Sequence, residues 1–208
     1  MILIGQYDSP FVRRVGIALT LYEMNFEHRP WSVFGDSEKI AEYNPLRRVP
    51  TLVLNDGTAL LDSTTILLHL DEEVGSERAL LPPRGKERRD QLRTCSLAHG
   101  LCEKLVALIY ERVLHEVTSD IWVERCTRQI GEVLAVLEAE VAGLKREFVF
   151  GEKPGHADIA VAAAFRFLTD AHPSLRSAEP YNALSAHMAR CEALPAFQTI
   201  SQEFIPPA

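Results

Sequence analysis

No apolar run in the 208-residue sequence approaches the ~18–20 residues that a membrane-spanning helix needs. The N-terminus also lacks the basic stretch, apolar stretch and small-residue cleavage site of a secretory signal. The formal net charge is −7 and the pI about 5.5, so the sequence lacks the basic excess that favours binding to nucleic acid. We therefore expect a cytoplasmic protein that binds neither membranes nor nucleic acid.

Cysteine is scarce, and its spacing excludes two further classes of protein. The sequence contains no Cys-x-x-Cys pair and no zinc-ligand spacing, so we expect neither a disulfide framework nor a metal. Buried free thiols are the simpler interpretation. The cysteines concerned are Cys95, Cys102, Cys126 and Cys191.

The pattern along the chain changes after about residue 76. Residues 1–76 alternate short β-like runs with helical ones, whereas residues 87–208 are helical nearly throughout. In the expected linker, residues 77–86, the tandem prolines Pro82-Pro83 cannot continue a helix. The fold class predicted is an α/β domain followed by an all-α helical bundle.

The first region is predicted to have the order β-α-β-α-β-β-α and a mixed sheet. Asn55-Asp56-Gly57 is a strong hairpin signal between its last two strands. The predicted strands are Met1–Tyr7, Phe26–Pro30, Thr51–Leu54 and Ala59–Leu61, and the helices are Pro10–Met24, Ser37–Tyr43 and one that starts at Ser63. In the second region the predicted helices are Glu87–Val117, Ser119–Arg146, Ala157–Asp170, Asn182–Cys191 and Ala196–Phe204.

Ser9-Pro10 has the form of a helix N-cap followed by proline at the first helical position. Capping alone explains both residues. The alternative is that the Ser9 hydroxyl carries out chemistry, because it lies where a strand delivers the chain to the start of a helix.

Two other stretches have a pattern typical of ligand contact. Val49-Pro50 opens a strand, where proline indicates a tight turn and allows a cis peptide that would leave the Val49 backbone free to pair with an extended peptide. An ordinary trans proline is the alternative. Asp62-Ser63 precedes a helix whose N-terminus favours a carboxylate, with Ser63 as the cap and Asp62 able to bind an ammonium group. The two together match the zwitterionic end of an amino acid.

These stretches, in this order, resemble those of the cytosolic glutathione transferases. The resemblance is carried by Ser9 to Arg13, Asn44 to Pro50, Asp62 to Ile66 and Gly151 to Ile159, and it spans both regions. It implies a thioredoxin-like N-terminal domain, an all-helical C-terminal domain and a homodimer. It also implies that glutathione is the co-substrate.

The resemblance further implies a role for each matching residue. Ser9 matches the hydroxyl residue that stabilises the glutathione thiolate, as in serine-type members such as the theta and zeta classes. Val49, before a cis Pro50, matches the residue that pairs with the cysteinyl backbone. Asp62 and Ser63 match the pair that holds the γ-glutamyl group.

The basic position near the glycyl carboxylate departs from the family pattern. Arg48 matches that position, but Arg47 replaces a glycine common before it, so either arginine is a candidate for the ligand contact. Gly155 replaces the usual serine or threonine cap, and glycine is an acceptable N-cap. Gly151 and Asp158 are interpreted as structural residues.

Tyr7 is a rival catalytic hydroxyl, because some classes use a tyrosine near the end of the first strand. Here Tyr7 is expected to lie within that strand. The acceptor pocket is expected between the domains, lined by Tyr7–Phe11, the loop Trp31–Phe34 and part of the first long helix. Residues considered on that helix are His99, Glu103, Tyr110 and Arg112, although packing or solvation is the more common role of such residues.

The function predicted from the resemblance is transfer of glutathione to small electrophiles. Alternatives on the same fold are a glutathione-dependent isomerase, peroxidase or disulfide reductase. A different class of hypothesis is a non-catalytic binding module. Retention of Ser9, Val49-Pro50 and Asp62-Ser63 together favours an enzyme.

Overall fold

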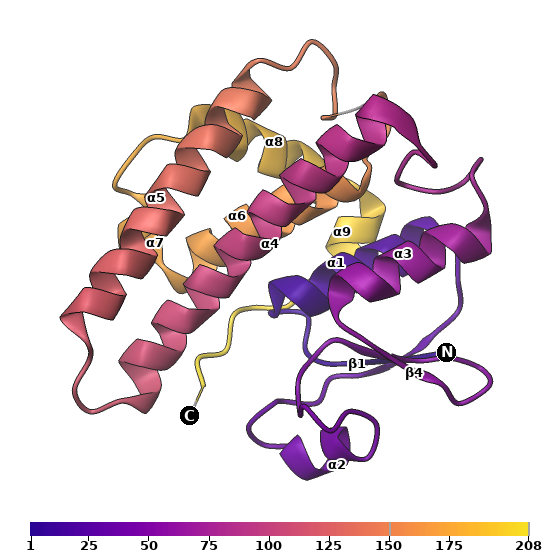
Figure 1. The fold of residues 1–208 in the computed structure, drawn as a ribbon, viewed down its shortest axis with the longest axis horizontal. Coiled ribbons are helices and arrows are strands. Elements are labelled where there is room, and N and C mark those ends of the chain that lie inside the picture. Colours follow the sequence, from indigo (N-terminus) through magenta and orange to yellow (C-terminus); the bar gives the residue numbers. More distant parts are fainter. Residues whose placement is uncertain (150, 208) are drawn as a thin grey trace.

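A four-stranded mixed sheet organises the N-terminal part of the computed structural model, which describes residues 1–149 and 151–207 (Figure 1). The strand order is β2-β1-β3-β4, with β1 parallel to β2 and antiparallel to β3, and β3 antiparallel to β4. The strands are β1 (Ile2–Ile4), β2 (Glu27–Arg29), β3 (Thr51–Val53) and β4 (Ala59–Leu61). The predicted element order and mixed sheet are confirmed.

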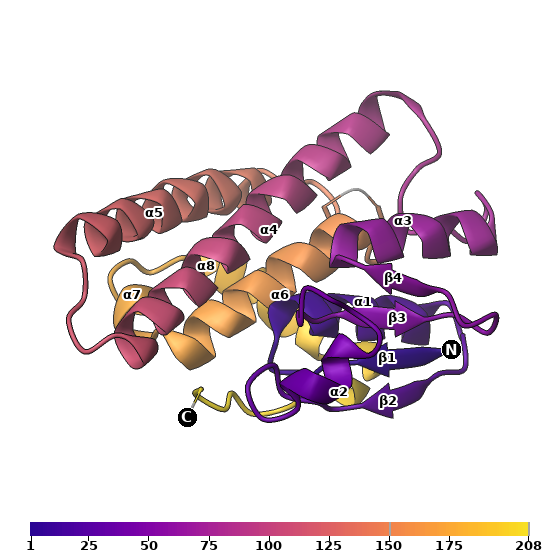
Figure 2. The ribbon, with the colours of Figure 1, turned by 60° about the horizontal axis from the view of Figure 1, so that its bottom comes forward.

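Alternation along the short strands separates two apolar faces of the sheet. Leu3 and Leu52 pack with α1 (Pro10–Leu21) and α3 (Ser63–Val74) on one face. Ile4 and Val53 pack with Ile40 of α2 (Ser37–Ala41) on the other face (Figure 2). The sheet is therefore covered on both sides, and its ends remain available to build a site.

The first strand is shorter than the predicted Met1–Tyr7 because Gly5 ends it. Gly5 has a φ of +127°, and a Cβ there would lie 2.5 Å from Val12 Cγ2 and 2.8 Å from Val49 Cβ. Only glycine combines this conformation with so close an approach. The expectation that Tyr7 lies within β1 is therefore wrong, since β1 ends at Ile4 and Tyr7 lies in a turn.

The remaining helices form the C-terminal part of the chain. The long α4 and α5 run side by side, and the buried α6 packs against α4 (Figure 1). Within the described residues, no helix combines the length and apolar character needed to cross a bilayer. The helices are α4 (Gly85–Leu114), α5 (Asp120–Ala142), α6 (His156–Ala171), α7 (Pro173–Arg176), α8 (Asn182–Glu192) and α9 (Pro195–Thr199).

Several boundaries differ from those predicted. α1 ends at Leu21 rather than Met24, and Glu23 then takes a φ of +58°. α4 begins at Gly85, so the last two residues of the expected linker are helical. The predicted helix Ala196–Phe204 is wrong beyond Thr199, because the chain continues to residue 207 without helical hydrogen bonding. We call residues 200–207 the C-terminal tail.

The two parts of the chain meet on α1. Ile17 of α1 packs with Ile159 of α6 and with Phe197 and Ile200 from the end of the chain. The buried Arg13 adds polar contacts, because its guanidinium pairs with both oxygens of Glu192 at 2.7 Å and its Nε donates to the Ile200 carbonyl at 2.9 Å. This confirms the interpretation of Arg13 as a brace between the two parts.

Candidate active site

A cleft of about 880 Å³ opens where the start of α1 faces the second half of α4. Its walls also include the loop at residues 31–35, the segment 47–49 and the last residues of the C-terminal tail. Phe34 from the loop meets Tyr110 of α4 edge to face, with ring centroids 5.6 Å apart. Tyr110 is the one member of the set considered on α4 that lines the cleft; His99, Glu103 and Arg112 are not among its lining residues.

Ser9 lies on the wall of this cleft at the N-terminus of α1. Its Oγ accepts a hydrogen bond from the Val12 N–H at 3.4 Å, so Ser9 is the N-cap that its pairing with Pro10 predicts. No acceptor among the described residues takes the hydroxyl proton. The side chain therefore caps the helix through its oxygen while its proton remains available to a ligand.

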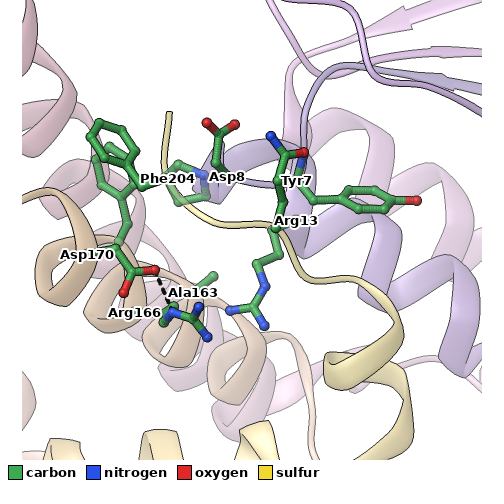
Figure 3. A pocket seen from close by; sticks show the side chains of 10 residues that line it. Tyr7, Asp8, Arg13, Ala163, Arg166, Asp170 and Phe204 are labelled. Atoms are coloured by element: carbon green, nitrogen blue, oxygen red, sulfur yellow. Dashed lines mark hydrogen bonds and ion pairs between the residues drawn. The ribbon is translucent and has the colours of Figure 1, made fainter. Parts of the chain in front are cut away.

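Tyr7 lies close by but faces elsewhere. Its ring stacks on His28 at a centroid distance of 3.8 Å, and it is not among the residues that line the cleft. Figure 3 shows the Tyr7 ring directed away from Phe204 and Asp170. Burial raises the pKa of Tyr7 to about 12. The geometry thus separates the two rival hydroxyls, and Ser9 is the one exposed in the cleft.

The peptide bond between Val49 and Pro50 is cis, as the proline at the start of β3 allows. Val49 lines the cleft, whereas Pro50 is buried behind it. The Val49 N–H has no hydrogen-bond partner within residues 1–149 and 151–207. A main-chain donor is therefore available beside Ser9 in the same cleft.

The two candidate arginines differ in their partners. The guanidinium of Arg47 forms an ion pair with Glu38 at 2.5 Å and a hydrogen bond to Ser37 Oγ at 3.1 Å. Arg48 also lines the cleft, and its side chain has no such partner in the described part of the chain. Arg47 has a φ of +53°, the region that favours glycine, which explains why a glycine suits this position.

The start of α3 corrects one sequence-based expectation. The N-cap is Asp62 and not Ser63, because Asp62 Oδ1 accepts from the Thr64 N–H at 2.8 Å and from the Thr65 N–H at 3.3 Å. Ser63 is the first helical residue, and its buried Oγ has no partner among the described residues. Neither Asp62 nor Ser63 lines the cleft itself.

Strand pairing nevertheless brings the start of α3 next to the segment before β3. Thr51 pairs with Leu61 in the antiparallel ladder, so Pro50 and Asp62 each lie one residue beyond a matched pair. The candidate residues therefore form one continuous surface from Ser9 through Val49 to Ser63.

Arg14 is a candidate that the sequence analysis missed. It is 5% exposed, and its guanidinium donates to Thr64 Oγ1 at 3.2 Å and lies 3.4 Å from His99 Nδ1. No carboxylate of the described residues forms an ion pair with it, and its Nε has no hydrogen-bond partner. A buried cation without a counter-ion is costly, so this group favours an anion at the start of α3.

The C-terminal tail is the second feature that the sequence analysis missed. Phe204 lines the cleft, and Ile205 donates its backbone N–H to Asp8 Oδ2 at 3.1 Å. In Figure 3 the tail passes between the labelled side chains of Phe204 and Arg13. Burial raises the pKa of Asp8 above its usual range. The Pro206-Pro207 pair was the sequence signal, since it argues against a helix reaching this far.

The cysteines and acidic residues provide no obvious metal centre. Within the described residues, no group of three or more His, Cys, Asp or Glu side chains is arranged to hold a metal ion. All four cysteines are free and buried, as the sequence analysis expected. Burial raises the pKa of the Cys95 thiol to about 11.

Asp158 and Gly155 have the structural role expected of them. Asp158 Oδ2 accepts from the Gly155 N–H at 2.9 Å and Oδ1 accepts from the Val149 N–H at 2.8 Å, which ties the loop before α6 to the helix start. Both residues lie away from the cleft.

Two family models match this chain. The model described as glutathione S-transferase, N-terminal domain, matches residues 3–78, and the model described as glutathione S-transferase, C-terminal domain, matches residues 120–190. Together they cover more than half of the sequence. Among curated proteins, the probable glutathione S-transferase GSTU1 of Oryza sativa subsp. japonica is 27% identical over 170 residues, which cover 77% of this chain and 71% of that protein.

Solved structures show the same similarity over the whole chain. A glutathione S-transferase from Methylobacterium radiotolerans in complex with glutathione sulfonate aligns with a TM-score of 0.87 and 26% identity, covering 100% of this chain and 98% of that one. A glutathione transferase family member from Pseudomonas fluorescens with bound glutathione aligns with a TM-score of 0.82 and 29% identity, covering 100% and 99% of the two chains.

Proposed function

The chain belongs to the glutathione S-transferase family, and from this premise we propose that Ser9 stabilises the thiolate of glutathione bound in the cleft. The thiolate then attacks a small electrophilic substrate. The observation that carries the proposal is the position of Ser9: its oxygen is held by the Val12 N–H, while its proton has no acceptor among the described residues and faces the cleft.

A serine at this position is sufficient for the task. A thiol with a pKa of ~8.5 is only a few per cent ionised at neutral pH, so a useful decrease is one to two pH units, or ~1.4–2.7 kcal/mol. A hydrogen bond to a charged group contributes ~1.5–3 kcal/mol, and a helix N-terminus adds ~0.3–1 kcal/mol. Ser9 offers both, because it donates from the N-terminal end of α1.

The middle and the glycyl end of glutathione are assigned to the segment before β3. The unpaired Val49 N–H is suited to pair with the cysteinyl backbone as a neighbouring strand would. Arg48 is assigned to the glycyl carboxylate, because Arg47 is already engaged by Glu38. This resolves the choice between the two arginines in favour of the unpaired one.

The γ-glutamyl end is assigned to the start of α3. The exposed Asp62 carboxylate is suited to the ammonium group, and the unpartnered Ser63 Oγ to the carboxylate. Arg14 supports this assignment, since it is a buried cation that contacts Thr64 and has no carboxylate partner in the described part of the chain. An anion held at this helix N-terminus would also interact favourably with the helix dipole.

The reaction requires no covalent bond to the enzyme. The glutathione sulfur forms a bond to the electrophilic carbon, and the bond from that carbon to its leaving group breaks, with the leaving group taking the electron pair. The role of the protein is to hold the sulfur ionised beside an apolar acceptor region. Phe11, Phe34 and Tyr110 contribute to that region.

Isomerisation, peroxide reduction and disulfide reduction remain the alternatives on the same site, and a non-catalytic module is the alternative without chemistry. Within the family we assign the chain to the serine-type members, although Tyr7-Asp8-Ser9-Pro10 lacks the further serines typical of zeta members around the catalytic serine. A homodimer in the cytoplasm is part of the same proposal.

Retention on immobilised glutathione, followed by assays with aryl halides, hydroperoxides and disulfides, tests this function. Retention with turnover of an aryl halide supports the transferase. Absence of both retention and thiolate absorbance would favour the non-catalytic module instead.

A further inference from the structure

We infer that residues 202–207 of the C-terminal tail form a wall of the acceptor site and, held there by Asp8, set which electrophiles the enzyme accepts. The inference rests on the proposed function, since it concerns the half of the cleft that glutathione does not fill. It makes Ile205 and its neighbours specificity-determining residues and Asp8 a positioning residue.

Two hydrogen bonds fix the tail against the residues that immediately precede Ser9. Gln202 Oε1 accepts from the Tyr7 N–H at 3.1 Å, and Asp8 Oδ2 accepts from the Ile205 N–H at 3.1 Å. The beginning of the tail is also held, because the Ile200 side chain is buried and its carbonyl accepts from Arg13 Nε. The tail is therefore attached at three points along its length.

The tail presents apolar groups to the cleft beside Ser9. Phe204 packs edge to face on Phe167 of α6, with ring centroids 5.6 Å apart, and both rings line the cleft. Ile205 is 56% exposed although it is aliphatic. Pro206 and Pro207 follow it along the wall, and their fixed φ angles and missing N–H groups make this surface stiff and apolar.

The tail is separate in sequence and structure from the residues assigned to glutathione. Its hydrogen bonds to the N-terminal part go to Tyr7 and Asp8, whereas Val49 and Ser63 belong to the segment before β3 and to the start of α3. Changes in the tail should therefore alter affinity for the group attached to sulfur more than affinity for glutathione itself.

Binding of S-methylglutathione and S-hexylglutathione measures this directly, because the two probes differ only in the apolar group that would enter the acceptor site. Titration calorimetry is carried out on the unaltered chain and on a chain ended at Ser201. Each buried methylene contributes about fourfold in affinity, so the unaltered chain should prefer the hexyl probe. The shortened chain should lose about tenfold of that preference and keep its affinity for glutathione within about threefold.

Substitutions at Asp8 test the attachment without shortening the chain. Asp8→Ala removes the acceptor for the Ile205 N–H, whereas Asp8→Asn keeps a carbonyl oxygen there. The alanine variant should lose several-fold of the hexyl preference, and the asparagine variant should recover most of it. Glu203→Ala is the matched control, because Glu203 is an exposed tail residue that does not line the cleft.

The outcomes separate this inference from the proposed function. Glutathione binding with a reduced hexyl preference in the shortened and Asp8→Ala chains supports it. Glutathione binding with an unchanged preference in both would overturn it and leave the proposed function intact. Failure of the unaltered chain to bind glutathione would overturn the proposed function and this inference together.

Discussion

The Oγ of Ser9 accepts the Val12 N–H at 3.4 Å, and this contact fixes the serine at the start of α1 with its proton directed to no described protein group. Capping and chemistry are therefore compatible roles for one hydroxyl. The cap places the oxygen at the positive end of the helix dipole, where an anionic sulfur is also favoured.

Replacement of Tyr7 by phenylalanine tests the rival hydroxyl. The Tyr7 ring stacks on His28 outside the cleft, and phenylalanine preserves that stacking. We expect kcat/KM for glutathione to remain within about twofold, since no interaction with the transition state is lost. A decrease of about tenfold or more would instead assign the thiolate contact to Tyr7.

The two neighbouring arginines should differ when each is replaced by alanine. Arg48→Ala should raise the KM for glutathione about fivefold, because a solvent-exposed contact to the glycyl carboxylate is lost. Arg47→Ala removes a guanidinium already paired with Glu38, so its effect on KM should stay below about twofold. Initial-rate kinetics with varied glutathione measures both, and the reverse order would exchange the assignments.

Arg13 should contribute to stability rather than to catalysis. Arg13→Met leaves the Glu192 carboxylate and the Ile200 carbonyl without their buried partner, which should lower the free energy of unfolding by about 3 kcal/mol. Urea unfolding measures this change. Arg128→Met is the control, because it breaks only an exposed pair with Glu124 and should cost less than about 0.5 kcal/mol. Equal effects of the two substitutions would contradict the bracing role.

The buried His187 should make stability depend on pH. Burial lowers its pKa to about 4, whereas in the unfolded chain it takes up a proton near pH 6.5. Its folded-state pKa is lowered, so its stabilising contribution is present above about pH 6.5 and is lost as the pH falls toward 4. Asp158, 3.6 Å away, acts in the opposite direction, because burial raises its pKa to about 6.

Replacing His187 by glutamine isolates the histidine contribution. The destabilisation caused by His187→Gln should be smaller at pH 5 than at pH 7 by about 2 kcal/mol, since only the unaltered chain must keep a buried imidazole neutral. Urea unfolding at the two pH values measures the difference. A destabilisation that is equal at both would contradict the lowered pKa.

The fold was predictable where local patterns agree with the tertiary structure. The hairpin signal at Asn55-Asp56-Gly57 and the proline-started α1 both appear as expected. The end of β1 was missed because Gly5 acts through a close approach to Val12 and Val49, which are distant in sequence or on another element. Phe204 was assigned to a helix because its apolar spacing cannot reveal that it packs on Phe167.

The site was predictable to a similar extent. Ser9, Arg48 and Val49 follow from short motifs, and the structure brings them into one cleft. The cap at α3 was assigned to the wrong neighbour, because Asp62 and Ser63 are both good caps and only the left-handed φ of Asp62, +69°, distinguishes them. Arg14 was missed because its meaning lies in the absence of an acid partner among the described residues, a property of the folded chain.

The pKa of the thiol of bound glutathione, measured by thiolate absorbance as a function of pH, tests the central claim most directly. In the unaltered chain we predict a pKa one to two units below the ~8.5 of a free thiol. In Ser9→Ala, at saturating glutathione, it should return to within about half a unit of that value, with kcat at neutral pH lower by about tenfold or more. An equally low pKa and unchanged kcat in Ser9→Ala would contradict the assignment of Ser9.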